Sequence, residues 1–209
     1  VAPFPGNRAI IANDPIRGTF MADTESRFAR MSRRAAITGA ALATMALAAC
    51  GGGAKGAAEG DMGLGAPEGA KVTVVEYASV TCPHCALWQK NTWPAFKAKY
   101  VDTNKVRYVF RELPTGPVNV AVAGFMIARC AGDDKYFDVV HNILASQDEW
   151  QAGVNPRDTL FRIGNGAGLS NQQIEACIKD PDNLKAAEER SEAALKAGVT
   201  GTPAFFVNG

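Results

Sequence analysis

A Cys-Pro-His-Cys sequence at residues 82–85 stands where a predicted β-strand gives way to a predicted α-helix. The preceding segment 72–77 is apolar and rich in β-branched residues, which favours a strand. Pro83 falls at the first helical position, where its missing N–H leaves no hydrogen bond unmade. The helix therefore begins at the motif, and Cys82 lies beside free N–H groups and the positive end of the helix dipole. A thiolate at Cys82 is stabilised there, which favours thiol–disulfide exchange.

His84 and Cys85 complete the redox interpretation of this motif. His84 adds a donor or a positive charge beside the Cys82 sulfur, and Cys85 is close enough to close a small disulfide ring with Cys82. A lone Cys-x-x-Cys can also be half of a zinc site, but structural zinc takes four ligands at recognisable spacings. The 209 residues contain no second Cys-x-x-Cys and one further histidine, His141, which lies on an apolar helical stripe. We therefore predict a redox-active Cys82–Cys85 disulfide, no metal site and no cofactor.

A second informative pattern lies near the end of the chain. A Gly-containing turn at 198–201 precedes Thr202 and Pro203, and the apolar segment 204–207 follows. A proline that opens an apolar strand after such a turn indicates a cis X–Pro bond at the start of the strand. We therefore predict a cis Thr202–Pro203 bond with a strand directly after it.

These two motifs, at residues 76–85 and 201–207, resemble the DsbA-like branch of the thioredoxin superfamily. The match extends over about residues 63–209, and the order of the two motifs along the chain makes it specific. The resemblance implies that Cys82 is the attacking cysteine and Cys85 the resolving cysteine.

The resemblance also implies roles for three residues around the cysteines. Pro203 would be the cis-proline that faces the disulfide, and Thr202 before it would offer backbone hydrogen bonds to an extended substrate. Glu76, six residues before Cys82, matches the acidic residue beneath the active site in this superfamily. The alternative for Glu76 is an ordinary solvated strand residue.

The spacing of apolar residues predicts an α/β fold. Strands are expected at about 72–79 and 105–111, and a helix at about 83–99 that is kinked at Pro94. From about 118 to 196, apolar residues recur at helical spacing, so we expect this part to consist of helices.

Two helix starts are marked within the helical part, at Asn155–Pro156 and at Ser170. An all-helical block at about 117–196, inserted between thioredoxin strands, is the architecture of the DsbA-like branch. The resemblance therefore implies a thioredoxin-like domain over residues 71–209. Such domains continue with another strand and a final helix, so we expect the chain, which stops at Gly209, to be truncated before these elements.

Cys130 and Cys177 both fall in the helical block. An exported protein meets an oxidising compartment, where cysteine pairs usually oxidise. Some DsbA-like proteins carry a second, non-catalytic disulfide in the helical insert, and the resemblance implies a structural Cys130–Cys177 disulfide. The alternative is two separate buried thiols.

Residues 31–50 resemble a bacterial export signal. Met31–Arg34 is positively charged, and residues 35–49 form an apolar stretch that is too short for a comfortable transmembrane helix. The Leu-Ala-Ala-Cys sequence that ends at Cys50 resembles a lipoprotein box, which predicts a lipid on Cys50. The alternative is cleavage near the alanines without a lipid.

The segments on either side of this signal carry little pattern. Residues 1–30 are interpreted as an upstream segment that a mis-assigned translation start adds to the protein, with Met31 as the true first residue. The alternative is a short cytoplasmic tail before an uncleaved anchor. Residues 51–70 are rich in Gly and Ala, and we expect them to form a flexible tether.

Charge and motifs together point to one function. The formal net charge is +1 at pH 7, and its basic excess lies in the first 50 residues, so the folded part has no nucleic-acid footprint. We predict an exported thiol–disulfide oxidoreductase of the bacterial periplasm, soluble or anchored as a lipoprotein, that introduces disulfides into other exported proteins. Its expected partners are unfolded or extended exported proteins and a membrane redox partner that reoxidises it. The alternatives are a reductase or isomerase of the same fold, or a membrane-tethered metal-binding or structural module.

Overall fold

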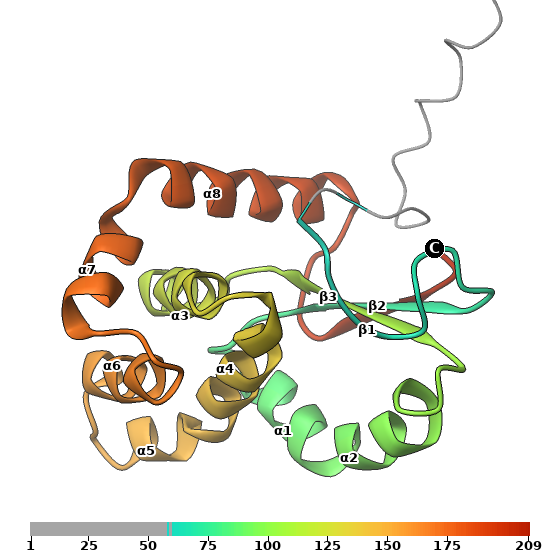
Figure 1. Cartoon of the computed structure of the whole chain (residues 1–209), viewed down its shortest axis with the longest axis horizontal. Helices are drawn as coiled ribbons and strands as arrows, with labels where there is room; N and C mark the ends of the chain where they lie inside the picture. The colour runs from blue at the N-terminus through green and yellow to red at the C-terminus, as the bar shows by residue number, and fades with distance from the viewer. Residues whose placement is uncertain (1–57, 59) are drawn as a thin grey trace, which may run out of the picture. The chain divides into compact units, whose positions relative to one another are not determined.

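The computed structural model describes residue 58 and residues 60–209. The expected upstream segment, export signal and Cys50 lie outside the described residues. Within the described part, four strands form one mixed sheet in the order β1-β3-β2-β4 (Figure 1). The strands are β1 (Met62–Gly65), β2 (Thr73–Ala78), β3 (Arg107–Glu112) and β4 (Ala204–Val207).

The helices follow the predicted order. Between β2 and β3 lie α1 (Pro83–Asn91), α2 (Trp93–Phe96) and the π-helical turn η1 (Lys97–Val101). Between β3 and β4 the chain is helical, which confirms the predicted thioredoxin-like α/β fold with an all-helical insertion. This block consists of α3 (Val118–Cys130), α4 (Asp133–Ala145), α5 (Gln147–Gln151), α6 (Pro156–Gly166), α7 (Asn171–Lys179) and α8 (Pro181–Lys196).

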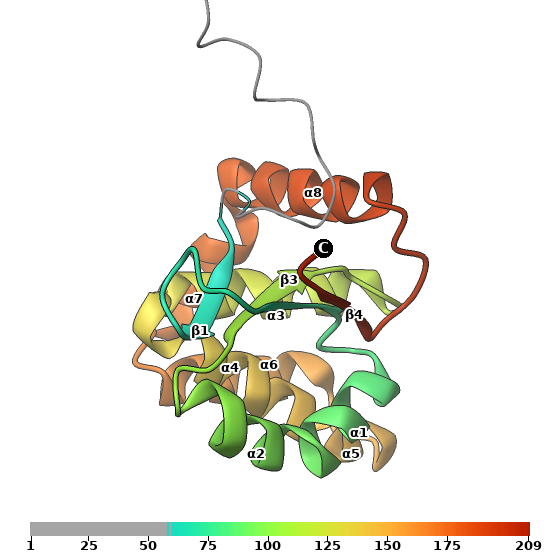
Figure 2. The same ribbon diagram turned by 90° about the vertical axis from the view of Figure 1, so that its right-hand side faces the viewer.

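The central strands β2 and β3 run parallel and are covered on both faces. Alternate side chains of a strand point to opposite faces of its sheet. Val74, Ala78 and Tyr108 therefore belong to the large core shared with α1, α3 and α4, whereas Val75 and Tyr77 belong to a smaller core beneath the end of α8. Figure 2 shows α8 on one side of the sheet, with α1, α2 and α4 on the other. The sheet thus forms the middle layer of the described domain.

Strand β1 corrects the expectation of a tether over residues 51–70. Residues 62–65 pair antiparallel with β3, and Met62 lies opposite Phe110. Gly65 requires glycine: its φ is positive, and a Cβ on it would lie 2.5 Å from the backbone carbonyl oxygen of Val106. A Cβ on Gly63 would come closest to the end of the flexible Arg107 side chain, at 2.9 Å. At residues 62–65 the chain is therefore a paired strand and not a tether.

An ion pair attaches the start of β1 to the sheet. The guanidinium of Arg111 binds both carboxylate oxygens of Asp61, with two N···O distances of 2.8 Å, and donates to the Tyr77 hydroxyl at 2.9 Å. Both charged side chains are largely buried. Paired, two-point hydrogen bonding of this kind fixes geometry as well as charge, so β1 is held in one register.

The helix expected over 83–99 is divided. α1 ends at Asn91, and α2 begins at Trp93 with Pro94 in its first turn. Because proline lacks an N–H and crowds the preceding turn, a continuous helix through Pro94 would be destabilised. The interruption that proline predicted is therefore present, two to three residues earlier than the proline itself. The predicted helix starts are also present, since Asn155 caps α6 and Ser170 forms a capping box at α7.

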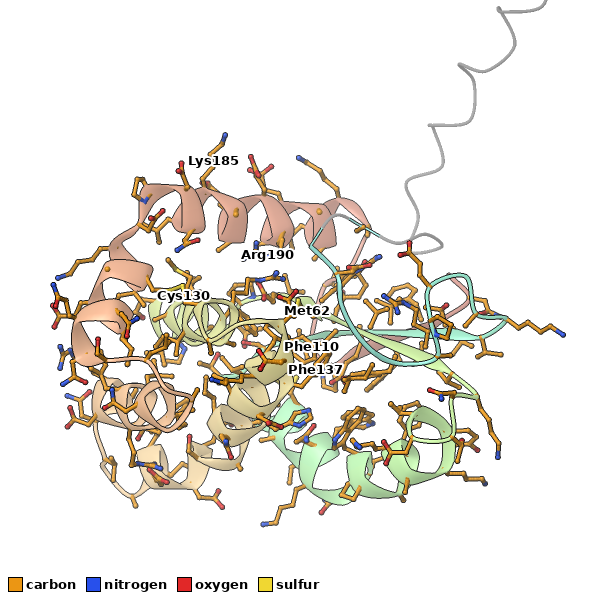
Figure 3. The ribbon with its side chains drawn as sticks, in the orientation of Figure 1. Met62, Phe110, Cys130, Phe137, Lys185 and Arg190 are labelled. Atoms are coloured by element: carbon orange, nitrogen blue, oxygen red, sulfur yellow. A yellow bond between two sulfur atoms is a disulfide. The ribbon has the colours of Figure 1, made fainter. Side chains whose placement is uncertain are left out.

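A buried carboxylate joins the sheet to the helical block. Glu112, at the end of β3, is 3% exposed. It accepts hydrogen bonds from Arg129 of α3 at 2.6 Å, from the Tyr136 hydroxyl of α4 at 2.9 Å and from Arg190 of α8 at 2.7 Å. Figure 3 shows Arg190 on the inner side of α8, opposite the outward-pointing Lys185. Removing one partner of such a buried cluster typically costs about 3–5 kcal/mol of stability.

A disulfide joins Cys130, at the end of α3, to Cys177 in α7, the pair that the resemblance implied. Asn183 at the start of α8 donates its side-chain amide to the Cys177 carbonyl at 3.2 Å. The bond closes a loop of 47 residues. In the chain-entropy model, a loop of this length stabilises the folded state by about 4 kcal/mol at most.

We expect the double variant Cys130→Ser/Cys177→Ser to fold but to melt at a lower temperature. Removing the cross-link restores entropy to the unfolded chain, so the free energy of unfolding should fall by about 2–4 kcal/mol. Calorimetry of the oxidised wild type and the variant measures this, and peptide mapping without reductant tests for the cross-linked peptide. Equal melting temperatures, or recovery of both cysteines as free thiols, would contradict the assignment.

Candidate active site

Cys82 occupies the N-cap of α1, and Pro83 takes the first helical position, as the sequence predicted. The side chain is 6% exposed. Its Sγ lies 3.3 Å from the carbonyl oxygen of Thr202 and donates to it. A helix leaves its first four N–H groups without intrahelical partners, and Cys82 stands at that end of α1, although its side chain accepts no hydrogen bond from them in the dithiol form. Its sulfur instead contacts the loop that enters β4.

Cys85 lies one turn further along α1 and is 1% exposed. Cys82 and Cys85 are both free thiols, so the structure represents the dithiol form of the pair. Burial raises the pKa of the Cys85 thiol, and contact with the Cys82 sulfur raises it further. Negative charge is therefore disfavoured at Cys85, which is enclosed more deeply than Cys82.

The loop opposite the two cysteines carries the second motif. The Thr202–Pro203 peptide bond is cis, as predicted, and β4 begins at the next residue. β4 pairs antiparallel with β2, which places Ala204 beside Tyr77. A further cis bond, Gly116–Pro117, was not anticipated from the sequence. His84 lies exposed between the cysteines, on the first turn of α1.

Glu76 lies in the core beneath the cysteines and is 2% exposed, so the solvated alternative is wrong. Burial raises its pKa from 4.5 to about 7, although a hydrogen bond from the Tyr108 hydroxyl lowers it. Burial and the neighbouring Glu76 carboxylate raise the pKa of Tyr108, and the charge of Cys85 adds to this effect. Glu76, Tyr108 and Cys85 therefore form one buried cluster. Tyr108 was not identified from the sequence, because its strand pattern marked it only as a core residue.

Hydrogen bonds from two distant segments hold the loop that leads into Cys82. The Ser79 hydroxyl accepts from the Thr115 N–H at 3.1 Å, and the Thr81 hydroxyl donates to the Thr115 carbonyl at 2.9 Å. Gln147, the first residue of α5, donates its side-chain amide to the carbonyls of Val80 at 2.7 Å and Cys82 at 3.2 Å. Nothing in the local sequence identified Gln147, because its partners lie more than sixty residues earlier in the chain.

His141 is a core-edge residue, as its position on an apolar stripe predicted. Its ring packs edge-on against Trp93, with centroids 5.2 Å apart, and burial lowers its pKa to about 4. In the part of the chain that the structure describes, no three His, Cys, Asp or Glu side chains are grouped so that they could hold a metal ion. None of the described helices is both long and apolar enough to cross a membrane.

Comparisons with known proteins agree on one family. The thioredoxin family model matches residues 57–209. A provisionally named protein-disulfide oxidoreductase of Rickettsia bellii is 38% identical over 153 residues, which make up 72% of this chain and 58% of that protein. The chain therefore spans a little more than half the length of this curated relative.

Two solved structures with a similar fold are alpha-DsbA1 and BdbD. Alpha-DsbA1 of Wolbachia pipientis is 30% identical, has a TM-score of 0.66, and is matched over 73% of this chain and 76% of that one. BdbD of Bacillus subtilis, in its oxidised form, has a TM-score of 0.65 at 17% identity and is matched over 74% and 84% of the two chains, a likeness of fold alone. With its Cys-Pro-His-Cys at the start of α1 and its cis-proline loop opposite, the chain belongs to the thioredoxin family, within its DsbA-like branch.

Proposed function

We propose that this protein is an exported oxidase that introduces disulfides into other exported proteins. The position of Cys82 is the observation that carries the proposal. Its sulfur lies at a helix N-terminus, where negative charge is favoured, and it contacts the Thr202 carbonyl at 3.3 Å. The second sulfur, on Cys85, is enclosed. An incoming thiol therefore reaches Cys82 more readily than Cys85.

The reaction then takes two exchange steps. In the oxidised protein, a substrate thiolate attacks the Cys82 sulfur, which forms a mixed disulfide and breaks the Cys82–Cys85 bond. Cys85 leaves as a thiolate and takes up a proton. A second substrate thiolate attacks the substrate sulfur of the mixed disulfide, which expels Cys82 as a thiolate. The substrate loses two electrons, and the two enzyme cysteines gain them.

The surroundings of the two sulfurs favour this direction of electron flow. A dithiol in which the attacking cysteine is stabilised as a thiolate is hard to oxidise, so the corresponding disulfide is a strong oxidant. The helix N-terminus at Cys82 and the exposed His84 beside it both favour negative charge on that sulfur. The reduced protein would need an electron acceptor for the next cycle, and we assign this role to a membrane redox partner.

Equilibration of the Cys82–Cys85 pair with glutathione tests this assignment. We expect a reduction potential more positive than about −200 mV, in the range of oxidants and away from roughly −270 mV for thioredoxin. The oxidised protein should also oxidise a reduced substrate protein with two thiols, and Cys82→Ser should abolish that oxidation. A potential near the thioredoxin value would instead assign the protein to the reductases, and metal bound after purification would favour a metal-binding module.

Glu76 is the group best placed to handle the proton of Cys85. It is buried in the same cluster, and its pKa of about 7 allows it to take up and release a proton near neutral pH. Tyr108 links the two groups, because its hydroxyl donates a hydrogen bond to Glu76 and its pKa is raised by the charge of Cys85. Groups that transfer protons work best with a pKa near the operating pH. We therefore assign to Glu76 the role of proton acceptor and donor for Cys85.

We expect Glu76→Gln to remove a pH dependence of stability. Because the pKa of Glu76 rises from 4.5 to about 7 on folding, the folded protein binds a proton that the unfolded chain has lost between these values. The free energy of unfolding therefore falls as the pH rises from 4.5 to about 7. Above pH 7 the ionised Glu76 lowers it by at most about 3 kcal/mol. The variant should be about 1–3 kcal/mol more stable than the wild type at pH 8 and similar to it near pH 4.

Urea unfolding across this pH range measures the difference between the two proteins. The rate at which Cys85 is released from the disulfide by a small thiol should fall in the same variant, because the nearby proton carrier is gone. Parallel pH profiles of stability for wild type and variant would show that Glu76 does not titrate in this window.

The proposed location rests on the sequence before the described residues. A positive segment, a short apolar stretch and Cys50 follow one another as in a lipoprotein export signal. A lipid on Cys50 would hold the domain at a membrane surface that faces the periplasm. There it would meet extended proteins as they emerge from export.

We expect the mature protein to begin at Cys50 and to partition into detergent, because acyl chains bury apolar surface in a membrane. The variant Cys50→Ala should be found in the soluble periplasmic fraction instead. Fractionation after osmotic shock, with mass spectrometry of the mature N-terminus, measures both outcomes. Wild-type protein found wholly in the shock fluid would contradict the anchor and leave export intact.

A further inference from the structure

A pocket of about 620 Å³ opens beside the redox centre. One wall is formed by one side of α1 and by Pro94 of α2; the α1 residues that line it are Pro83, Ala86, Leu87, Gln89 and Lys90. The other wall comes from the helical block, at the end of α4 and along α5, which both figures place next to α1. The lining there consists of His141, Asn142, Leu144, Ala145, Gln147, Asp148 and Gln151.

The pocket lies on the far side of α1 from the strand β4. Trp88 of α1 faces β4 and contacts Phe205, with ring centroids 4.9 Å apart. Leu87, the preceding residue, turns instead toward the pocket. A substrate that passes the cis-proline loop on one side of Cys82 therefore has this pocket on the other side.

The pocket is joined rigidly to the nucleophile. Gln147 lines it and also donates its amide to the carbonyls of Val80 at 2.7 Å and Cys82 at 3.2 Å. Gln147 is 6% exposed. The next residue after Cys82, Pro83, forms the near end of the pocket. A group bound there is consequently held at a fixed position relative to the Cys82 sulfur.

The chemistry of the lining favours an apolar ligand. Leu87 is 53% exposed, so it presents apolar surface to an incoming group. Pro83, Pro94 and Ala145 add further apolar surface, and the side-chain amides of Gln89, Asn142 and Gln151 supply neutral polar groups around it. Lys90 and Asp148 carry opposite charges, so the lining has no net charge that would select an ion. Burial lowers the pKa of His141 to about 4, which leaves this ring neutral at physiological pH.

We propose that this pocket is a specificity subsite for an apolar side chain of the substrate polypeptide, two residues from the cysteine that bonds to Cys82. The proposal rests on the function proposed above. In an extended chain, side chains two residues apart point the same way and lie about 7 Å apart. When the substrate cysteine points to Cys82, the side chain two positions away points to the same surface of the enzyme and enters the pocket. Residues of the size of Leu, Met or Phe fit this volume.

Rates of reduction of the oxidised full-length protein by single-cysteine peptides test the subsite. The peptides carry Leu or Ser two positions from the cysteine, on either side of it. For wild type we expect the Leu peptide to react about tenfold faster than the Ser peptide, the discrimination that an apolar pocket achieves with a few methylenes. In Leu87→Ser, and in Ala145→Trp, which fills the pocket from an exposed position, this ratio should fall toward one.

Leu195→Ser is the matched control, because Leu195 is an exposed leucine of α8 outside the pocket, 59% exposed. This variant should keep the wild-type ratio. Dithiothreitol, which is too small to occupy the pocket while it reacts, reports on the redox centre itself. Failure of dithiothreitol to reduce the protein would overturn the proposed function. Normal reduction by dithiothreitol with a peptide ratio of one in wild type, or with the wild-type ratio retained in both pocket variants, would overturn the subsite alone.

Discussion

Burial of β2 on both faces is the constraint on which the chemistry of this domain depends. Val75 and Tyr77 pack beneath α8, while Val74 and Ala78 pack toward α1 and α3. A strand enclosed in this way exposes reactive groups only where it ends, and this strand leads into Cys82. The same enclosure acts on Glu76, which cannot be solvated. Burial of this carboxylate shifts its proton affinity to near neutrality. One packing arrangement therefore places Cys82 beyond the end of a buried strand and a carboxylate of raised pKa within that strand.

Local rules were sufficient to predict the parts of the site that depend on neighbouring residues. Pro83 at the first helical position placed Cys82 at the N-cap, and the proline that opens β4 indicated its cis bond. Local rules failed where composition and contacts disagree. The glycines around β1 suggested a tether, yet Gly65 has a positive φ and lies against the Val106 backbone carbonyl, which leaves no room for a side chain. A sequence does not distinguish a glycine in a flexible linker from a glycine that allows close backbone packing.

The contacts that could not be predicted are those that bridge distant segments. The sequence predicts Tyr108 as a core residue, and only the structure shows that its hydroxyl donates to Glu76. The sequence likewise gives Gln147 as a polar residue at a helix start, and only the structure shows that its amide donates to the Cys82 carbonyl. The Tyr108 contact depends on the pairing of β3 with β2, and the Gln147 contact depends on how the helical block packs against the sheet, neither of which periodicity encodes. The block therefore belongs to the candidate active site, since it holds the loop that carries Cys82 and forms one wall of the adjoining pocket.

The carboxylate of Glu112 has a consequence for how the domain comes apart. Three donors on three different helices share this one buried group. If α8 detached alone, Arg190 would leave the carboxylate with fewer partners inside the core, and a buried charge tolerates that poorly. Local unfolding of α8 is therefore coupled to local unfolding of α3 and α4, so these helices should unfold as one cooperative unit. In amide hydrogen exchange, β3 and these three helices would then share a common opening free energy, higher than that of the separate helix α1 at the redox centre.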